Sequence, residues 1–138
     1  MKPHVLIVDD DFELQELFRM ILGRHFEISQ AYTGVEAVGL TLQSIPDLVL
    51  LDVMLPDIDG FEVFRQLKAD NRTRAVPVML VTARADILSL VEAQNLPVDD
   101  VLKKPFAPRE LLQRVNKILQ RPDVSPGTGK LQPVAAAA

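Results

Sequence analysis

Acidic, hydroxyl and amine side chains directly follow several short apolar runs of this 138-residue chain. The acidic residues are Asp9, Asp10, Asp11 and Asp52, the hydroxyl belongs to Thr82, and the amines belong to Lys103 and Lys104. Carboxylates that gather in one place repel each other, so such a cluster either takes up protons or holds a cation. A site of oxygen ligands without His or Cys suits Mg²⁺, which also accepts water and phosphate oxygens as ligands. The acidic residues therefore indicate a magnesium site.

The lysine and the hydroxyl extend this chemistry to phosphate. A lysine ammonium acts as a mobile point charge for phosphoryl oxygens. Aspartate is itself a known nucleophile in phosphoryl transfer, where positioning and charge neutralisation supply most of the catalysis. The residue types therefore indicate phosphoryl transfer to or from a carboxylate. The pattern alone does not choose between Lys103 and Lys104.

Each of these residues has a plainer explanation when it is taken alone. Asp is a preferred N-cap, so Asp10 or Asp11 would serve to begin a helix, and Asp52 would fit a turn. Their shared position is harder to explain in this way, because ligands bind at the carboxyl ends of the strands in an open parallel sheet. The joint placement therefore favours a functional site.

Apolar runs and segments of helical periodicity alternate along the chain. The runs predict strands at residues 5–8, 26–32, 47–52, 76–82 and 101–103. Apolar residues at helical spacing predict helices that begin near residues 11, 33, 59, 86 and 108. The segment from Thr33 to Glu36 has the form of a capping box, and Asp59 is placed to cap the third helix.

Five strands that alternate with five helices predict an α/β fold with one parallel sheet and helices on both faces. Right-handed crossovers leave few topologies, and we expect the doubly wound strand order 2-1-3-4-5. We place this domain in residues 1–121. Residues 122–138 contain no aromatic residue and no sustained period, and we expect them to form a flexible linker or tail.

The composition narrows the class of protein. The chain is 48% hydrophobic and 25% charged, as globular domains are, and its net charge of −4 argues against nucleic-acid binding by this segment. The absence of cysteine excludes a disulfide framework and a cysteine nucleophile. The first apolar run is too short for a signal peptide or a membrane span, so we expect a cytoplasmic protein that does not contact a membrane.

At the candidate site the chain resembles the CheY-like receiver domains of two-component response regulators, over about residues 2–120. Four blocks carry the resemblance: Asp9-Asp10, the stretch Asp52-Val-Met-Leu-Pro56-Asp-Ile-Asp-Gly60, the strand end Val81-Thr82-Ala83, and the turn Lys104-Pro105-Phe106. They appear in the family's order and at its usual spacing. The resemblance implies a flavodoxin-like fold. It also implies a signalling switch, not an enzyme, that catalyses only its own phosphorylation and dephosphorylation.

The resemblance assigns roles in phosphoryl transfer. Asp52 matches the phosphoacceptor, which receives its phosphoryl group from a sensor histidine kinase, from a phosphotransfer protein or from a small acyl phosphate. Lys104, the lysine directly before proline, matches the residue that pairs with the phosphoryl oxygens, and the bond to Pro105 is expected to be cis. Thr82 matches the hydroxyl that moves to donate a hydrogen bond to the phosphoryl group.

The resemblance also assigns the Mg²⁺ ligands. Asp10 and Asp52, with the backbone carbonyl of Met54, match the direct ligands, and Asp9 is expected to act through a bound water. Met54 and Arg84 occupy the variable positions that in this family influence the lifetime of the phosphoryl group.

Two departures concern how the signal would be transmitted. Receivers usually carry Tyr or Phe three residues before the lysine, where this chain has Val101, so the usual aromatic switch is in question. Ala107 stands where Ser often caps the fifth helix, a loss of about 1 kcal/mol on typical N-cap figures.

The fourth helix carries an unusually wide apolar arc made of Ile87, Leu88, Leu90, Val91 and Leu96. Such an arc would dock a second copy or an output partner on the face formed by helix 4, strand 5 and helix 5. The plainer explanation is a broad core stripe. Burial of both Leu88 and Leu90 would exclude docking.

Two other functions compete with the phosphoacceptor. One is a receiver-like module that binds partners regardless of phosphorylation, which Val101 favours and the complete acidic cluster disfavours. The other is a haloacid-dehalogenase-like phosphatase, which also uses an aspartate nucleophile with Mg²⁺. Its Asp-x-Asp motif normally follows the first strand, whereas here the Asp57-Ile-Asp59 motif lies in a later loop.

Overall fold

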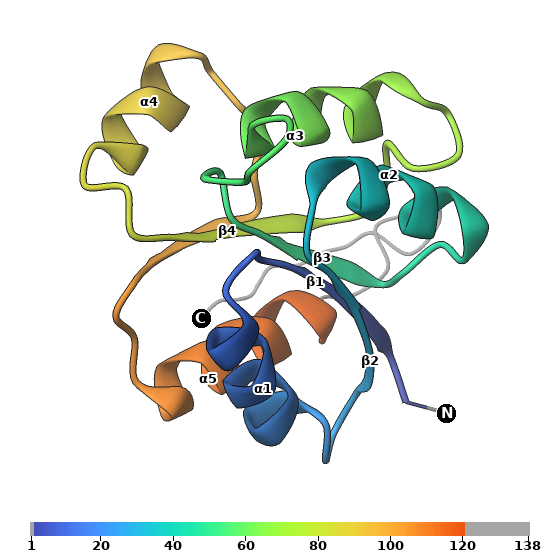
Figure 1. Cartoon of the computed structure of the whole chain (residues 1–138), viewed down its shortest axis with the longest axis vertical. Helices are drawn as coiled ribbons and strands as arrows, with labels where there is room; N and C mark the ends of the chain where they lie inside the picture. Colours follow the sequence, from blue (N-terminus) through green and yellow to red (C-terminus); the bar gives the residue numbers. More distant parts are fainter. Residues whose placement is uncertain (1, 121–138) are drawn as a thin grey trace.

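The computed structural model describes residues 2–120 as five strands that alternate with five helices (Figure 1). The strands are β1 (His4–Val8), β2 (Glu27–Ala31), β3 (Leu48–Leu51), β4 (Val78–Thr82) and β5 (Asp100–Lys103). The helices are α1 (Phe12–Leu22), α2 (Gly34–Gln43), α3 (Gly60–Ala69), α4 (Ile87–Ala93) and α5 (Pro108–Leu119). The tail predicted at residues 122–138 lies outside the described residues.

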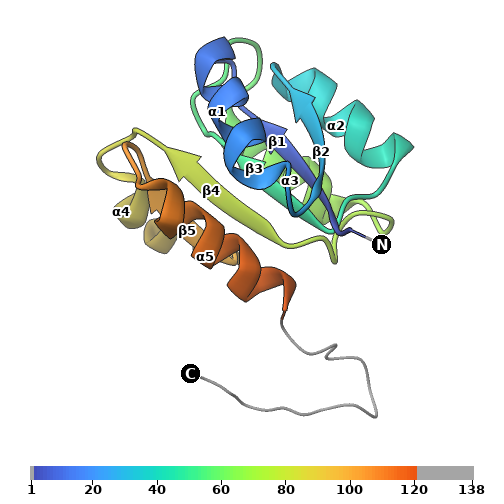
Figure 2. The same cartoon turned by 90° about the horizontal axis from the view of Figure 1, so that it is seen from below.

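All five strands run parallel in one sheet with the order β2-β1-β3-β4-β5. Helices α1 and α5 cover one face of the sheet, and α2, α3 and α4 cover the other (Figure 1). Viewed from below, α1 and α5 lie in front of the sheet (Figure 2). The predicted α/β fold and its strand order are confirmed.

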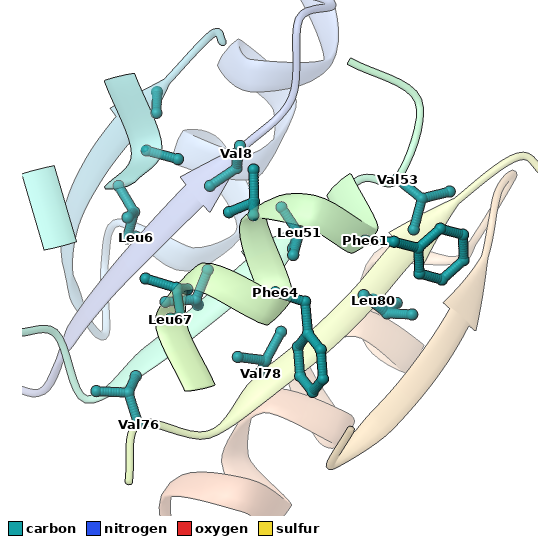
Figure 3. Packing of buried hydrophobic residues seen from close by; sticks show 14 of the residues in the cluster. Leu6, Val8, Leu51, Val53, Phe61, Phe64, Leu67, Val76, Val78 and Leu80 are labelled. Carbon is teal, nitrogen blue, oxygen red and sulfur yellow. The ribbon is translucent and has the colours of Figure 1, made fainter. Parts of the chain in front are cut away.

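Each face of the sheet has its own hydrophobic core, because alternate strand residues point to opposite faces. In β1, Leu6 and Val8 join the core beneath α2, α3 and α4, whereas Val5 and Ile7 join the core beneath α1 and α5. Figure 3 shows the first core, in which α3 contributes Phe61, Phe64 and Leu67. Coverage of both faces explains why the strands appear in the sequence as continuous apolar runs.

Polar side chains explain where three of the helices begin. Asp11, Thr33 and Asp59 each accept hydrogen bonds from backbone N–H groups in the first turn of α1, α2 and α3. These N–H groups have no partner within the helix, so the caps satisfy them. Helix α5 has no side-chain cap, because Ala107 precedes it. Asp11 is therefore the cap of α1, which leaves Asp10 available for the candidate site.

Helix α4 begins at Ile87, close to the predicted position, and only partly joins the core. Ile87 is fully buried, and Leu90, Val91 and Leu96 pack half-buried against the core beneath α2, α3 and α4. Leu88 is 59% exposed. The predicted arc is thus mainly a core stripe, although the condition that excludes docking, burial of both Leu88 and Leu90, is not met.

The strand boundaries differ slightly from those predicted. Strand β4 begins at Val78 and not at Val76, because the intervening Pro77 has no N–H to donate to the sheet.

Among residues 2–120, no helix combines the length and the apolar composition needed to cross a membrane.

Candidate functional site

The register of the sheet brings the predicted site residues to one edge. Val8 pairs with Leu51, so the residues that follow them, Asp9 and Asp52, leave neighbouring strands at the same level. On the other side of β3, Thr82 at the end of β4 pairs with Lys103 of β5. Residues far apart in sequence therefore converge where the strands end, as expected for an open parallel sheet.

Three carboxylates meet at this edge. Oxygen atoms of Asp9, Asp10 and Asp52 all lie within 4.8 Å of one another, an arrangement able to hold a metal ion. Asp9 and Asp52 are only 1% and 4% exposed, whereas Asp10 is exposed. The cluster therefore has a buried base and an open side through which a ligand can enter.

Lys104 provides the positive charge of the cluster. Its Nζ atom lies 2.6 Å from Oδ2 of Asp9 and 2.7 Å from Oδ2 of Asp52. The sequence pattern left Lys103 and Lys104 open, and the structure distinguishes them, because only the Lys104 ammonium contacts these carboxylates within the described residues. The peptide bond from Lys104 to Pro105 is cis, as the resemblance implied.

The charges of the cluster perturb one another. Burial raises the pKa of Asp9, against the opposing effects of Lys104 and of the Asp11 backbone N–H. Burial also disfavours the charged form of Lys104, but its bonds to Asp52 and Asp9 outweigh this and raise its pKa. When all three carboxyl groups are ionised, one ammonium leaves two negative charges uncompensated, which equals the charge of one divalent cation.

The loop after β3 holds Asp52 from the other side. The backbone N–H of Met54 donates to Oδ1 of Asp52 at 3.0 Å, so both oxygens of this carboxylate have a defined partner. Gly60 packs directly on the same segment, since a methyl group on it would lie 2.3 Å from the Asp52 carbonyl oxygen. The loop thus fixes the orientation of the Asp52 side chain.

Known proteins are similar to this chain in sequence. A family model described as response regulator receiver domain matches residues 5–116. The chain belongs to this family. The DNA-binding dual master transcriptional regulator RpaA of Synechocystis sp. is 38% identical over 129 residues, which are 93% of this chain and 54% of that protein. The receiver therefore spans about half the length of this curated relative.

Two solved structures extend the comparison. A putative response regulator from Chloroflexus aurantiacus has a TM-score of 0.80 and 34% identity, and the match covers 88% of this chain and 100% of that one. The BeF3-activated DrrB receiver domain has a TM-score of 0.76 and 31% identity, with coverage of 88% and 100%. This chain is thus a receiver domain of the two-component type.

Thr82 lies at the receiver site without contacting its charges. It is fully buried at the end of β4, and its hydroxyl accepts a hydrogen bond from the backbone N–H of Arg84 at 3.3 Å. The Thr82 carbonyl accepts a hydrogen bond from the Lys104 backbone N–H at 2.9 Å, but within residues 2–120 the Thr82 hydroxyl makes no hydrogen bond to the side chain of Asp52 or Lys104. Val101, where receivers usually have an aromatic ring, is half-buried against the core beneath α4.

The structure also explains the Asp-x-Asp motif that suggested a phosphatase. The Asp57 carboxylate accepts hydrogen bonds from the first N–H groups of α2, and Asp59 caps α3. Both carboxylates are thus engaged at helix ends. Family membership and these contacts together rule out the haloacid-dehalogenase-like alternative.

Sequence reasoning missed one residue of the receiver site. Gln15 of α1 is fully buried, and its Nε2 donates to the carbonyl oxygens of Ile7, Asp9 and Ala31 at 2.9 to 3.2 Å. It therefore ties α1 to the ends of β1 and β2, next to the acidic cluster. The available signal was its spacing, because Gln15 shares the buried stripe of Phe18 and Leu22.

Proposed function

We propose that Asp52 is the residue that accepts the phosphoryl group. The observation that carries this proposal is the buried Asp52 carboxylate, held between the Met54 N–H and the Lys104 ammonium. An Asp52 oxygen attacks the phosphorus of a phosphohistidine or an acyl phosphate. A new P–O bond forms as the bond to the donor breaks, and the leaving group keeps the electron pair.

The donor set fits a magnesium ion. Asp9, Asp10 and Asp52 would hold it with the backbone carbonyl of Met54, because hard oxygen ligands and two uncompensated negative charges suit Mg²⁺. When bound, the ion supplies neutralisation of the charge on the phosphoryl oxygens. The similarity to DrrB supports a phosphoryl-accepting site beside these ligands, since that receiver was solved in a BeF3-activated form.

Lys104 and Thr82 complete the proposed site. Lys104 exchanges part of its contact with Asp9 and Asp52 for the phosphoryl oxygens, which offer a stronger negative charge to the same ammonium. The Thr82 hydroxyl is available as a donor, because its present contact only accepts the Arg84 N–H. Its reorientation toward the phosphoryl group is the event that reports phosphorylation.

The partner of this site is a sensor histidine kinase or a phosphotransfer protein. The response is delivered to an output partner or a second copy over α4, β5 and α5. RpaA is a DNA-binding regulator of which this chain matches about half, and we propose that DNA contact belongs to such a further segment and not to the receiver. A cytoplasmic location stays a prediction.

The assignment is tested by mass spectrometry. The protein is incubated with acetyl phosphate and Mg²⁺, and we expect wild type to gain the mass of one phosphoryl group while Asp52→Asn gains none. Omission of Mg²⁺ should also prevent the gain. No gain in wild type, or an equal gain in Asp52→Asn, would overturn the assignment.

A phosphorylation-independent module remains the second candidate because Val101 replaces the usual aromatic ring. Beryllofluoride with Mg²⁺ mimics the phosphorylated state, so self-association is measured by sedimentation with and without it. A receiver switched by phosphorylation changes its association or its NMR spectrum over α4 and β5. A spectrum that changes only beside Asp52 would favour the independent module.

A further inference from the structure

The loop that follows β3 is hydrogen-bonded to helix α2, which lies earlier in the chain. Oδ1 of Asp57 accepts a hydrogen bond from the Gly34 N–H at 2.8 Å, and Oδ2 accepts one from the Val35 N–H at 2.9 Å. These are the first two residues of α2, whose N–H groups have no partner within the helix. Asp57 therefore caps α2 from a distance of more than twenty positions along the chain.

Side-chain packing also brings this loop into close contact with the start of α2. A methyl group on Gly34 would lie 2.4 Å from Cγ1 of Ile58 and 2.9 Å from Cγ2 of Val63. Ile58 thus lies directly against the backbone at the start of α2, and only glycine leaves it room. The polar contact of Asp57 and the apolar contact of Ile58 hold the same two segments together.

Two further hydrogen bonds hold the two ends of the loop. The Met54 N–H donates to Oδ1 of Asp52, and the Gly60 N–H donates to the Val53 carbonyl at 2.9 Å. Met54 therefore lies between two anchored carboxylates, Asp52 in the acidic cluster and Asp57 on α2. A loop anchored on both sides loses little further conformational freedom when one of its carbonyl groups binds an ion.

We propose that Asp57 is a positioning residue for the metal site, whose contact with α2 holds the loop so that the Met54 carbonyl stands ready to bind Mg²⁺. The inference rests on the proposed function, in which that carbonyl is a ligand. Without the contact, binding of the ion must itself order the loop. Mg²⁺ affinity therefore falls.

A simple capping role for Asp57 has to be separated from this positioning role. Thr33 offers the matched control, because it caps the same end of α2 from within, through the Glu36 N–H at 3.1 Å. Thr33→Ala weakens the helix end but leaves the loop attached. Asp57→Ala weakens the same helix end and also frees the loop. Asp57→Asn keeps one acceptor oxygen and provides an intermediate variant.

The experiment titrates Mg²⁺ into wild type and each variant of the 138-residue chain by isothermal calorimetry and measures stability separately by urea unfolding in EDTA. We expect Thr33→Ala and Asp57→Ala to lose similar stability. Unlike Thr33→Ala, Asp57→Ala should bind Mg²⁺ more weakly, by about tenfold, the lower end of the loss seen when a group that orients a metal ligand is removed. Asp57→Asn should lie between Asp57→Ala and wild type.

The possible failures are distinguishable. If wild type binds no Mg²⁺, the proposed function fails before the role of Asp57 is reached. If wild type binds Mg²⁺ and both Asp57 variants bind it as tightly as wild type does, the positioning role is overturned. Equal weakening by Thr33→Ala and Asp57→Ala would also overturn it, because the effect would then belong to helix α2.

Discussion

The ammonium of Lys104 lies 2.7 Å from Oδ2 of Asp52, although 52 positions separate the two residues in the sequence. The same ammonium contacts Asp9 at 2.6 Å, so a single cation bridges the two buried carboxylates. An incoming phosphoryl group would compete for this ammonium. The contact thus connects the stability of the metal-free protein with the chemistry proposed for Asp52.

Replacement of Lys104 by Met should destabilise the metal-free protein. The change leaves two buried carboxylates facing each other without a counter-charge, which typically costs about 3 kcal/mol, less the relief that solvent gives at this partly open site. We expect a loss of about 2 kcal/mol in the free energy of unfolding, measured by urea denaturation in EDTA. Lys103→Met is the control, with a change of about 0.5 kcal/mol or less. Equal stability of the two variants would contradict the bridging role.

Magnesium should stabilise the folded protein through the acidic cluster. A ligand that binds only the folded state adds about 2.7 kcal/mol at a concentration of about 100 times Kd. We expect Mg²⁺ to raise the free energy of unfolding of wild type and EDTA to reverse the increase. Asp10→Asn should lose most of the increase, whereas Asp70→Asn, in an exposed pair with Arg72, should keep it. An unchanged response in Asp10→Asn would remove Asp10 from the site.

Alanine substitutions at two glycines should have opposite effects. A methyl group on Gly60 would lie 2.3 Å from the Asp52 carbonyl oxygen, so the loop must shift, at a cost of about 1 to 3 kcal/mol. A methyl group on Gly39, inside α2, meets no atom within 4 Å, and the change should stabilise by about 0.5 to 1 kcal/mol. Thermal unfolding measures both. Similar effects at the two positions would show that the loop is not tightly packed.

The contact between Asp57 and α2 should respond to acid. The Val35 N–H and then the Gly34 N–H lower the pKa of Asp57 below its usual value of 3.8. A lowered folded-state pKa means that the stabilisation is present above pH 3.8 and is lost as pH falls through the folded pKa. The stability difference between wild type and Asp57→Asn should therefore shrink in that range. A difference that grows on acidification would refute the contact.

The loss of stability on replacing Gln15 should depend on the charge of the new side chain. Gln15→Met deletes a donor to three carbonyl groups but also removes Oε1, a buried atom without a hydrogen-bond partner among the described residues. We expect a net loss of about 1 kcal/mol. Gln15→Glu should cost more, because a carboxylate would face the same carbonyl oxygens. The order of the two midpoints in urea unfolding is the measurement.

Much of the site was predictable from local sequence. Continuous apolar runs ending in Asp9, Asp52 and Thr82 indicated buried parallel strands, and polar groups that follow such strands meet at one edge of the sheet. Local capping patterns also located the starts of α2 and α3. These features depend on neighbours only a few residues apart, and a single sequence contains that information.

Other features depend on contacts between distant segments. The choice of Lys104 over Lys103 by geometry and the burial of Gln15 both required the packed structure. The attachment of Asp57 to α2 gave no local signal, because aspartate in a loop is ordinary and its partners lie more than twenty positions away. Local patterns were therefore enough to locate the strand ends that carry the chemistry. Which charges touch was not predictable in this way, because side-chain contacts between distant segments depend on the register and packing of the whole sheet.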